Sequence, residues 1–459
     1  MSAKPVIVVF DVGKTNKKLF LFDENYQIVF EKSARFIETV DEDGFPCENL
    51  ESLRLSVFDS LSEVFRLKEF NIKAVNFSSY GASFVYVGED GKPVAPLYNY
   101  LKPYPNDLSE LFYARYGGEE KFARQTASPV LGSLNSGLQL YRLKKEKPQI
   151  FNRVKYALHL PQYLSFLLTG NHYSDLTSIG CHTAMWDFEQ NRYHEWIQHE
   201  GIALKLPPIV AANKTYPPLF PGTNYKVGIG LHDSSAALIP YLVNFNEPFV
   251  LISTGTWCIS LNPFNEHNLT DEELSQDCLC YLQYKGLPVK ASRLFSGNEY
   301  EQQSKRIATH FNVDVIKYRN IAYNPDTIKK LRKNQPQVLY GNDFKKESVF
   351  NTRNLADFKN DSEAYHQLVL DLINLQVAST QLVLKNSPAK RIFVDGGFSK
   401  NNVFMNLLAA EFKGLEVFAA SMAQASAVGA ALAIHKDWNN KPVPNDIIQL
   451  KYFSAGKHD

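Results

Sequence analysis

The chain opens with the stretch VIVVFDVGKTNKKLFLFD, residues 6–23, and this stretch decides the fold. Its first five residues are apolar and mostly β-branched, which is typical of a strand buried on both faces. A polar turn with one glycine follows at residues 11–18, and a second apolar run occupies residues 19–22. The pattern predicts a β-hairpin, with its polar residues gathered in the turn between the two strands.

The same order of strand, glycine-containing polar turn and strand returns in the second half of the chain. Residues 249–252 read FVLI, residues 253–256 read STGT and residues 257–261 read WCISL. A further strand at residues 391–394 runs into a turn with two glycines and then into a helix-like pattern. The sequence therefore predicts a duplicated α/β architecture, with one polar turn from each half facing a shared cleft.

The residue types of the first turn suit the binding of nucleotide phosphates. Asp11 at the end of a buried strand could hold Mg²⁺, directly or through water, because Mg²⁺ prefers oxygen ligands and keeps much of its hydration shell. Gly13 lets the backbone approach a phosphate closely. Thr15, Asn16 and either Lys17 or Lys18 could donate to phosphate oxygens. Such residues are also common in ordinary hairpin turns, so the turn alone leaves both interpretations open.

The triplet at residues 13–15, GKT, also resembles the end of a Walker A loop. That loop needs a glycine five residues before Gly13, and a helix must follow it. Position 8 is Val8, and the sequence predicts a strand after the turn. We therefore exclude a Walker A loop.

Asp233 is the candidate proton acceptor for phosphoryl transfer to an alcohol. Residues 231–236 read LHDSSA, and the pattern predicts a helix that begins at Asp233. A carboxylate beside an alcohol and a phosphate can take the hydroxyl proton as attack proceeds. Asp is equally common as a helix N-cap, and both roles are compatible if its side chain faces the cleft. His232 could hydrogen-bond to a sugar hydroxyl, although a lone histidine is more often a satisfied core residue.

The composition is that of an ordinary globular protein. The chain has 459 residues, of which 44% are hydrophobic and 21% charged, and a formal net charge of +1. This length predicts at least two domains, and the charge indicates neither a nucleic-acid nor a membrane partner. The five cysteines are odd in number and irregularly spaced, which predicts reduced thiols. With no targeting segment and no apolar stretch of eighteen residues recognised, we expect a cytoplasmic protein.

The predicted organisation has two halves, residues 1–243 and 244–459, with a largely helical insertion at about residues 99–208 in the first half. Apolar spacing also predicts a helix over residues 49–65, a strand at 74–77 and a hairpin-like unit at 84–92. The Ala-rich segment at residues 424–434 predicts a helix small enough to pack closely against a neighbour.

Taken in order, these segments resemble the FGGY carbohydrate kinases of the sugar kinase/heat-shock/actin superfamily. The resemblance is carried by the phosphate motifs at residues 11–16 and 253–256 and by an adenosine motif, DGGFSKN, at residues 395–401. Each motif is short, but their order and spacing across nearly the whole chain are much more specific than any one of them. The resemblance implies two actin-like (ribonuclease H-like) ATPase domains around a central cleft.

Within this family the sequence is most similar to rhamnulokinase-like and L-fuculokinase-like members. LHDSSA resembles their His-Asp-Thr-Ala segment, in which the Asp is the proton acceptor and its neighbours touch the sugar. The triplet GTW at residues 255–257 resembles their Gly-Thr-Trp, and SSYGAS at residues 78–83 resembles their Asp-Thr-Trp-Gly-Val-Asp. The triplet LTG at residues 168–170 matches the family's Leu-Thr-Gly.

The resemblance implies ATP-dependent phosphorylation of a ketose, with a deoxy-ketohexose such as L-rhamnulose or L-fuculose as the expected substrate and with ATP and Mg²⁺ as cofactors. It implies Asp233 as catalytic base and Asp11 as the metal site. The implied ATP-binding residues are Gly13, Lys14, Thr15, Asn16, Lys17, Thr254, Gly255, Thr256, Gln302, Gly396, Gly397 and Asn401. The implied substrate-binding residues are Gly81, His232, Asp233 and Ser234. The expected partners are the sugar and ATP, with neither nucleic acid nor membrane; a homodimer is left open.

Three departures from the family pattern bear on these expectations. Lys14 stands where the family has a small residue, and Ser78 and Ser83 stand where it has acids. They leave open another sugar or polyol substrate of the same family, such as xylulose, ribulose or glycerol. A different class also stays open, namely an actin-like conformational ATPase that acts on protein partners. Such a protein would not need Asp233 in the cleft, and no sugar would stimulate its ATP consumption.

Overall fold

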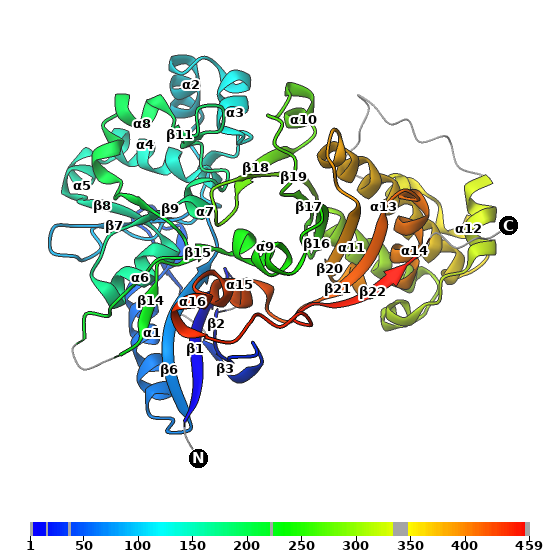
Figure 1. The fold of residues 1–459 in the computed structure, drawn as a ribbon. Helices are drawn as coiled ribbons and strands as arrows, with labels where there is room; N and C mark the ends of the chain where they lie inside the picture. Colours follow the sequence, from blue (N-terminus) through cyan, green and yellow to red (C-terminus); the bar gives the residue numbers. More distant parts are fainter. Residues whose placement is uncertain (1–2, 15–16, 35–37, 221–223, 334–347, 455–459) are drawn as a thin grey trace. The chain divides into compact units, whose positions relative to one another are not determined.

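The computed structural model of the chain describes residues 3–14, 17–34, 38–220, 224–333 and 348–454 (Figure 1). These residues form two compact α/β units. Unit 1 comprises Met1–Asn244, Cys280–Pro288 and Gln424–Ile447, and unit 2 comprises Phe245–Leu279, Val289–Ala423 and Ile448–Asp459. The predicted continuous halves, 1–243 and 244–459, differ from these units because two later segments join unit 1.

The sheet of unit 1 is built around the predicted opening hairpin. Strands β1 (Lys4–Val12) and β2 (Lys17–Asp23) pair antiparallel, with Val12 opposite Lys17 at the turn. The strand order is β13-β14-β6-β1-β2-β3, and β15 also pairs with β6. The remaining bounds are β3 (Ile28–Ala34), β6 (Phe70–Ser79), β13 (Thr215–Tyr216), β14 (Lys226–Gly228) and β15 (Leu231–His232). Strand β6 is parallel to β1, β14 and β15, so the carboxyl ends of four strands point the same way.

The apolar side chains of β1 are buried on both faces of the sheet, which matches its place between β6 and β2. Residues Val6 to Val9 of β1 are wholly inaccessible to solvent on both faces, as the run of apolar residues predicts. Helix α1 (Leu50–Phe65) contributes Leu53, Val57 and Leu61 to the core beside it. The helix begins where predicted, because the Asn49 side chain accepts a hydrogen bond from the Ser52 N–H as N-cap.

Helices α9 (Asp233–Asn244) and α15 (Ala425–Ala433) pack against each other, although they lie far apart in the sequence; Figure 1 shows one in green and the other in red. A Cβ added at Gly429 of α15 would lie 1.8 Å from the Ala236 carbonyl oxygen of α9. Only a glycine allows this approach, so the predicted close-packing helix is confirmed. The short helix α16 (His435–Trp438) follows α15.

The remaining part of unit 1 is largely helical, as predicted for residues 99–208. Its helices are α2 (Asn106–Arg115), α3 (Glu119–Thr126), α4 (Ser136–Glu146), α5 (Pro148–Arg153), α6 (Leu160–Thr169), α7 (Leu176–Ile179) and α8 (Glu195–His199). Two 3₁₀ helices, η1 (Gly132–Leu134) and η2 (Ile202–Lys205), lie among them. The layer has a core of its own, in which the Phe112 and Trp196 rings meet edge to face with centroids 5.1 Å apart.

Short strand pairs complete unit 1. They are β4 (Glu38–Val40) with β5 (Pro46–Glu48), β7 (Phe84–Val87) with β8 (Tyr156–His159), β9 (Ser174–Asp175) with β12 (Ile209–Val210), and β10 (Trp186–Asp187) with β11 (Arg192–Tyr193). The hairpin-like unit predicted at residues 84–92 forms only in part. The Gly88 N–H donates to the Lys92 carbonyl at 2.8 Å, but the strand finds its full partner in β8, far along the chain, because all four of its residues are buried.

Unit 2 repeats the sheet plan of unit 1. Strands β16 (Phe249–Thr254) and β17 (Cys258–Asn262) pair antiparallel, and β20 (Arg391–Gly396) runs parallel to β16, as β6 does to β1. The strand order is β18-β19-β17-β16-β20-β21-β22. The other bounds are β18 (Cys278–Leu282), β19 (Pro288–Leu294), β21 (Glu416–Ser421) and β22 (Gln449–Phe453), and the unit boundary falls within β18 and at the start of β19. The predicted duplication is therefore present in the strand pairing.

The described residues of unit 2 form the helices α10 (Asp271–Ser275), α11 (Ser296–His310), α12 (Pro325–Lys333), α13 (Asp361–Leu384) and α14 (Asn402–Glu411). Its 3₁₀ helices are η3 (Val315–Asn320), η4 (Val349–Thr352), η5 (Leu355–Asp357) and η6 (Phe398–Lys400). Helix α13 is long and apolar enough to span a bilayer by composition, but 67% of its most apolar window is buried within the protein. It is the central helix of the unit 2 core.

Candidate active site

The carboxyl ends of three neighbouring parallel strands bring the predicted acidic residues of unit 1 to one sheet edge. In the register, Asp11 of β1 lies opposite Ser78 of β6, and Ser78 lies opposite Leu231 of β15. Asp233 follows two residues after Leu231, as the first residue of α9. Ligand sites in open α/β sheets lie at this end of the strands, so the edge is the candidate site of unit 1.

Asp11 is held by a contact that the sequence did not predict. The Ser426 hydroxyl of α15 donates to Asp11 Oδ2 at 2.9 Å. Burial raises the pKa of the Asp11 carboxyl to about 6, against the opposing effect of the Ser426 hydrogen bond, and the nearby Asp233 charge raises it further. The Asp11 carboxylate is therefore poorly compensated by the protein, and a bound cation would stabilise it.

Asp233 lies at the start of α9, as predicted. Its Oδ1 accepts from the Ser234 N–H at 2.6 Å, and the Ser234 hydroxyl lies 3.4 Å from the same oxygen. Burial among protein atoms raises the pKa of this carboxyl to about 6, although 34% of the side-chain surface remains open to solvent. The group is thus reachable by a substrate, and its pKa lies near neutrality, as a general base requires.

The donor set at this edge fits Mg²⁺ better than it fits a caged transition metal. Among the described residues, no group of three or more His, Cys, Asp or Glu side chains is arranged so that it could hold a metal ion. Mg²⁺ is usually bound by one or two carboxylates together with substrate phosphates and water, and Asp11 offers one such carboxylate. The chemistry of Asp11 therefore fits the predicted metal role.

His232 is a buried, neutral histidine beside Asp233. Its Nε2 lies 3.3 Å from Asp233 Oδ1 and 3.1 Å from the Cys181 Sγ, and burial lowers the pKa of its imidazole to about 4. In the tautomer with its proton on Nε2, the imidazole can donate a hydrogen bond to the Asp233 carboxylate. The Nδ1 atom then has a lone pair with no hydrogen-bond partner in the described part of the chain. Nδ1 can therefore accept a hydrogen bond, and a substrate hydroxyl is a donor of the right kind.

Gly81, predicted to contact the sugar, lies against the His232 ring. A Cβ at position 81 would lie 2.9 Å from His232 Cδ2, so the glycine leaves room for the imidazole. Two other residues support His232 and were not predicted. Cys181 Sγ contacts its ring, and Thr177 Oγ1 accepts from the His232 backbone N–H at 3.0 Å. Both come from the helical insertion, which residue types alone do not connect to His232.

The first phosphate turn is described only in part, since Thr15 and Asn16 lie outside the described residues. Gly13 and Lys14 precede them, and Lys17 follows at the start of β2. Both lysine ammonium groups lie near the Glu48 carboxylate, a residue that the sequence did not single out. The predicted donors Lys14 and Lys17 are thus held together at the turn.

Unit 2 contains a cavity of about 500 Å³ beside its own glycine turns, lined among others by Thr254, Gly255, Tyr300, Gly397 and Asn401. Gly396 has φ +87°, and a Cβ there would lie 1.9 Å from the Thr254 carbonyl oxygen, so only glycine fits. A Cβ on Gly397 would meet nothing within 4 Å. The Gly396–Gly397 backbone therefore closes tightly on β16 on one side and faces open space on the other.

Two predicted ATP-binding side chains are engaged within the protein. The Thr254 hydroxyl donates to the Asp395 carbonyl at 2.5 Å and accepts from the Phe398 N–H at 3.0 Å, which ties the two turns together. Asn401 caps α14 by accepting from the Phe404 N–H at 3.1 Å, and its amide donates to the Tyr365 hydroxyl at 2.9 Å. Both residues line the cavity, but their side-chain polar atoms form hydrogen bonds within the protein and thereby hold the cavity wall in place.

Gly297 is a cavity residue that the sequence reasoning missed. A Cβ at this position would lie 1.8 Å from the Gly255 carbonyl oxygen, so the N-terminus of α11 packs directly on the turn. The neighbouring Asn298 N–H donates to the Thr256 carbonyl at 3.1 Å. The glycine of the SGN triplet at residues 296–298 was the available signal. Gln302, predicted to touch ATP, is exposed on α11 and donates to Asn298 Oδ1 at 2.9 Å, and it is not among the residues that line the cavity.

Curated relatives are distant and match over part of their length. The chain is 26% identical over 280 residues to a rhamnulokinase of Halalkalibacterium halodurans, a match that covers 54% of each chain. It is 23% identical over 269 residues to the L-fuculokinase of Escherichia coli, covering 55% of each. The chain thus matches about half the length of these relatives.

Solved structures share the fold over nearly the whole chain. A carbohydrate kinase from Novosphingobium aromaticivorans has a TM-score of 0.79 at 23% identity, covering 98% of this chain and 94% of its own. A xylulose kinase from Lactobacillus acidophilus has a TM-score of 0.75 at 16% identity, with the same coverage. These likenesses establish a two-domain sugar kinase fold.

Two family profiles account for most of the sequence. The profile described as the N-terminal domain of the FGGY family of carbohydrate kinases matches residues 6–239. The profile described as the C-terminal domain of carbohydrate kinase FGGY matches residues 246–442. The motif order, the duplicated sheets and these matches agree, and the chain belongs to the FGGY family of carbohydrate kinases.

Proposed function

We propose that the protein transfers the γ-phosphoryl group of ATP to a hydroxyl group of a ketose, with Asp233 as the proton acceptor. The observation that supports this most is the meeting of Asp11 and Asp233 at one sheet edge, each with a pKa raised to about 6. The Asp11 carboxylate can bind a cation, and the Asp233 carboxylate can accept the proton of a hydroxyl group. Phosphoryl transfer to an alcohol needs both functions.

In this proposal Asp233 accepts the hydroxyl proton as the oxygen attacks the γ-phosphorus. At pH 7 a carboxyl with a pKa near 6 is mostly ionised, and 34% of its side-chain surface is accessible. His232 orients the carboxylate through Nε2 and offers Nδ1 to a second substrate hydroxyl. Gly81 and Ser234 are proposed to border the sugar.

The ATP-binding role is proposed for the glycine turns and their neighbours. Mg²⁺ near Asp11 would supply positive charge to the phosphates when bound. The residues proposed to contact ATP are Gly13, Lys14, Thr15, Asn16, Lys17, Thr254, Gly255, Thr256, Gly396, Gly397 and Asn401. Gln302 is left out of this set because its amide is exposed and occupied with Asn298.

A deoxy-ketohexose such as L-rhamnulose or L-fuculose is the proposed substrate, supported by the names of the curated relatives. Xylulose is the second candidate, because a xylulose kinase shares the fold over nearly the whole chain. Cytoplasmic location is proposed from the relatives and from the five cysteines, which are all buried in the described ranges and form no disulfide. A homodimer is left open.

A coupled ADP-release assay over ketoses and polyols tests the proposal. The panel contains L-rhamnulose, L-fuculose, D- and L-xylulose, ribulose, gluconate and glycerol. We expect one deoxy-ketohexose to stimulate ADP release above the sugar-free rate and to be phosphorylated one to one with ADP formed. Stimulation by xylulose alone would move the substrate to the second candidate. ATP consumption that no sugar changes would contradict sugar phosphorylation and favour a conformational ATPase.

A further inference from the structure

Lys14 departs from the family pattern, and its surroundings in the structure give it a partner. We propose that Glu48 is a positioning residue that holds the Lys14 ammonium at the first turn until a nucleotide phosphate takes it over, while Lys17 stays paired with Glu48. The inference rests on the proposed function, since that function assigns phosphate to this turn.

One buried carboxylate faces two lysines. Lys14 Nζ lies 3.5 Å from Glu48 Oε1, and Lys17 Nζ lies 3.0 Å from Glu48 Oε2. The Tyr80 hydroxyl donates to Glu48 Oε1 at 2.8 Å. The Glu48 side chain is only 4% exposed, so its charge is held by these partners rather than by water. The two ammonium groups and the Glu48 carboxylate have a net charge of +1 among themselves, so one ammonium is available to an anion.

The two lysines differ in their ion-pair distance to Glu48 and in their exposure, although Glu48 Oε2 accepts no hydrogen bond in the described part of the chain. Lys17 belongs to β2, has the shorter contact and is 10% exposed. Lys14 belongs to the turn, has the longer contact and is 24% exposed. Its ammonium also lies 5.8 Å from the centre of the Tyr80 ring, a weak contact that a phosphate oxygen can replace. Lys14 is therefore the cation that a phosphate can recruit, and Lys17 is the one that stays.

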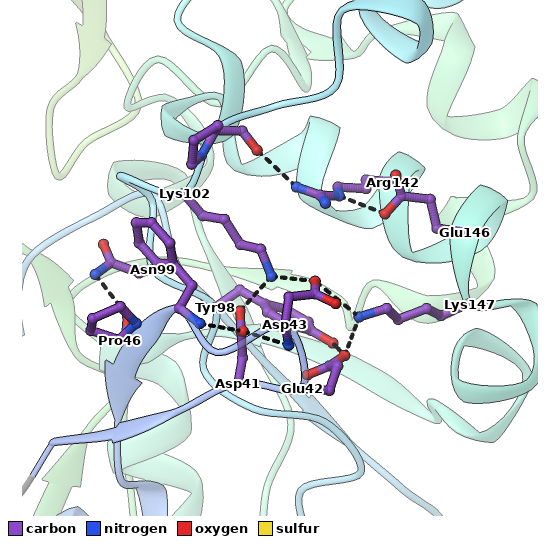
Figure 2. A network of polar contacts seen from close by, with 12 residues as sticks. Asp41, Glu42, Asp43, Pro46, Tyr98, Asn99, Lys102, Arg142, Glu146 and Lys147 are labelled. Carbon is purple, nitrogen blue, oxygen red and sulfur yellow. Dashed lines mark hydrogen bonds and ion pairs between the residues drawn. The ribbon is translucent and has the colours of Figure 1, made fainter.

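Glu48 itself is fixed from two sides. It directly precedes Asn49, the N-cap of α1, so its negative charge lies at the positive end of a 16-residue helix. It also ends β5, whose hairpin with β4 is anchored at the opposite end by an ion network. Figure 2 shows the Lys102 ammonium between Asp41 and Asp43, at 2.5 and 2.6 Å.

The same network reaches the helical layer of unit 1. Lys147, at the end of α4, pairs with Glu42, and the Tyr98 hydroxyl donates to Glu42 at 2.5 Å (Figure 2). The turn of the hairpin is thus fastened to two segments of the chain. An anchored hairpin keeps the Glu48 carboxylate in place when Lys14 leaves it, which is what a positioning residue requires.

A double-mutant cycle on nucleotide binding tests the inference without any sugar. Titration calorimetry with MgADP and with the Mg²⁺ complex of β,γ-imido-ATP is applied to the wild type, Lys14→Met, Glu48→Gln and the double variant. We expect Lys14→Met to weaken binding of the imido analogue about tenfold, the loss of one charge-assisted contact. Glu48→Gln should weaken it about threefold in the wild type and not at all in Lys14→Met, because its effect passes through Lys14.

The opposite results overturn the inference. Unchanged binding by Lys14→Met would show that Lys14 does not contact phosphate. Equal effects of Glu48→Gln in the wild type and in Lys14→Met would show that Glu48 does not act through Lys14. Tighter nucleotide binding by Glu48→Gln would show that the Glu48 carboxylate only neutralises the Lys14 charge and does not position it. Lys14→Arg, which keeps the charge, should restore most of the affinity. Lys32→Met is the matched control, because Lys32 pairs with Glu63 at 2.5 Å at the protein surface and should leave binding unchanged.

The outcome is separable from that of the proposed function. If the wild type binds nucleotide and the cycle behaves as expected but no sugar is phosphorylated, the proposed function fails and the role of Glu48 stands. If sugar is phosphorylated and the cycle shows no coupling, the role of Glu48 fails alone. If the wild type binds neither nucleotide, both fail.

Discussion

Asp11 and Asp233 carry the chemical argument at the scale of single residues. Both carboxyls are desolvated, and each has a pKa near 6 where an exposed Asp would have about 4. Because the pKa of each is raised, the neutral form is favoured below about pH 6 and the charged form above it. The Asp233 charge contributes to the raised pKa of Asp11, whereas the raised pKa of Asp233 comes from burial.

The pH profile of kcat/KM for the sugar should therefore fall on the acid side with a midpoint near pH 6. Below that pH Asp233 carries a proton and cannot accept another. Because burial, and not Asp11, raises the pKa of Asp233, any residual activity of Asp11→Asn should keep this acid limb in place. Initial rates between pH 5 and pH 8 at constant ionic strength check both points. An acid limb that moves in Asp11→Asn would contradict burial as the cause of the raised Asp233 pKa.

Gly297→Ala should damage the cavity of unit 2. The new Cβ would lie 1.8 Å from the Gly255 carbonyl oxygen, so α11 or the turn must move. We expect a loss of about 1–3 kcal/mol in the free energy of unfolding and at least tenfold weaker ADP binding. Gly397→Ala is the matched control for stability, because its Cβ meets nothing within 4 Å. Equal stability of both variants in denaturant titrations would contradict the close packing.

Residue types alone could identify Asp11, Gly13 and Asp233, since each belongs to a local pattern. They could not identify Glu48, Ser426 or Cys181. Each of these acts through a contact made by tertiary folding: Ser426 bonds to Asp11 from 415 positions away. Thr254 and Asn401 were recognised as site residues, but the structure was needed to show that their polar atoms bond within the protein.

At the scale of elements, strands with strong apolar runs were predictable and their distant partners were not. The hairpins around residues 10 and 254 appear as predicted, because both strands and the turn are adjacent in sequence. The β7 strand was assigned a local partner, yet β8 pairs with it across the helical insertion. Helix α15 was predicted from its small residues, but its packing on α9 depends on the return of the chain to unit 1.

Gly429→Ala should separate α15 from α9. Its Cβ would lie 1.8 Å from the Ala236 carbonyl oxygen, which belongs to rigid helical backbone. We expect a loss of about 3 kcal/mol in the free energy of unfolding. The hydrogen bond from the Ser426 hydroxyl to Asp11 should also be lost. Gly414→Ala, whose Cβ meets nothing within 4 Å, should change stability by less than about 0.5 kcal/mol. Thermal and urea unfolding compare the two, and equal losses would contradict the packing.

At the scale of the whole molecule, the duplicated sheets connect the sequence repeat to the family. Strands β1, β2 and β6 of unit 1 correspond to β16, β17 and β20 of unit 2 in order and direction. Each unit places a glycine turn at the end of its first strand. The repeat was readable in the sequence because the turns are local, whereas the membership of residues 280–288 and 424–447 in unit 1 depends on contacts over long distances.

The ion network of Figure 2 should matter for the stability of unit 1. Lys102→Met leaves the buried Asp41 carboxylate without its ammonium partner, so we expect a loss of about 2 kcal/mol in the free energy of unfolding. Lys155→Met is the control, because the Lys155–Glu89 pair is exposed on both sides and should change stability by less than about 0.5 kcal/mol. Urea titrations at pH 7 measure both; equal changes would contradict a structural role for the network.

The most direct test of the central claim is the rate of sugar phosphorylation by Asp233→Asn. The variant keeps the volume of the side chain and removes the proton acceptor. We expect it to bind MgADP with an affinity close to that of the wild type and to phosphorylate the preferred ketose at least about 100-fold more slowly. A turnover number near that of the wild type, with the sugar phosphate formed, would contradict the role of Asp233.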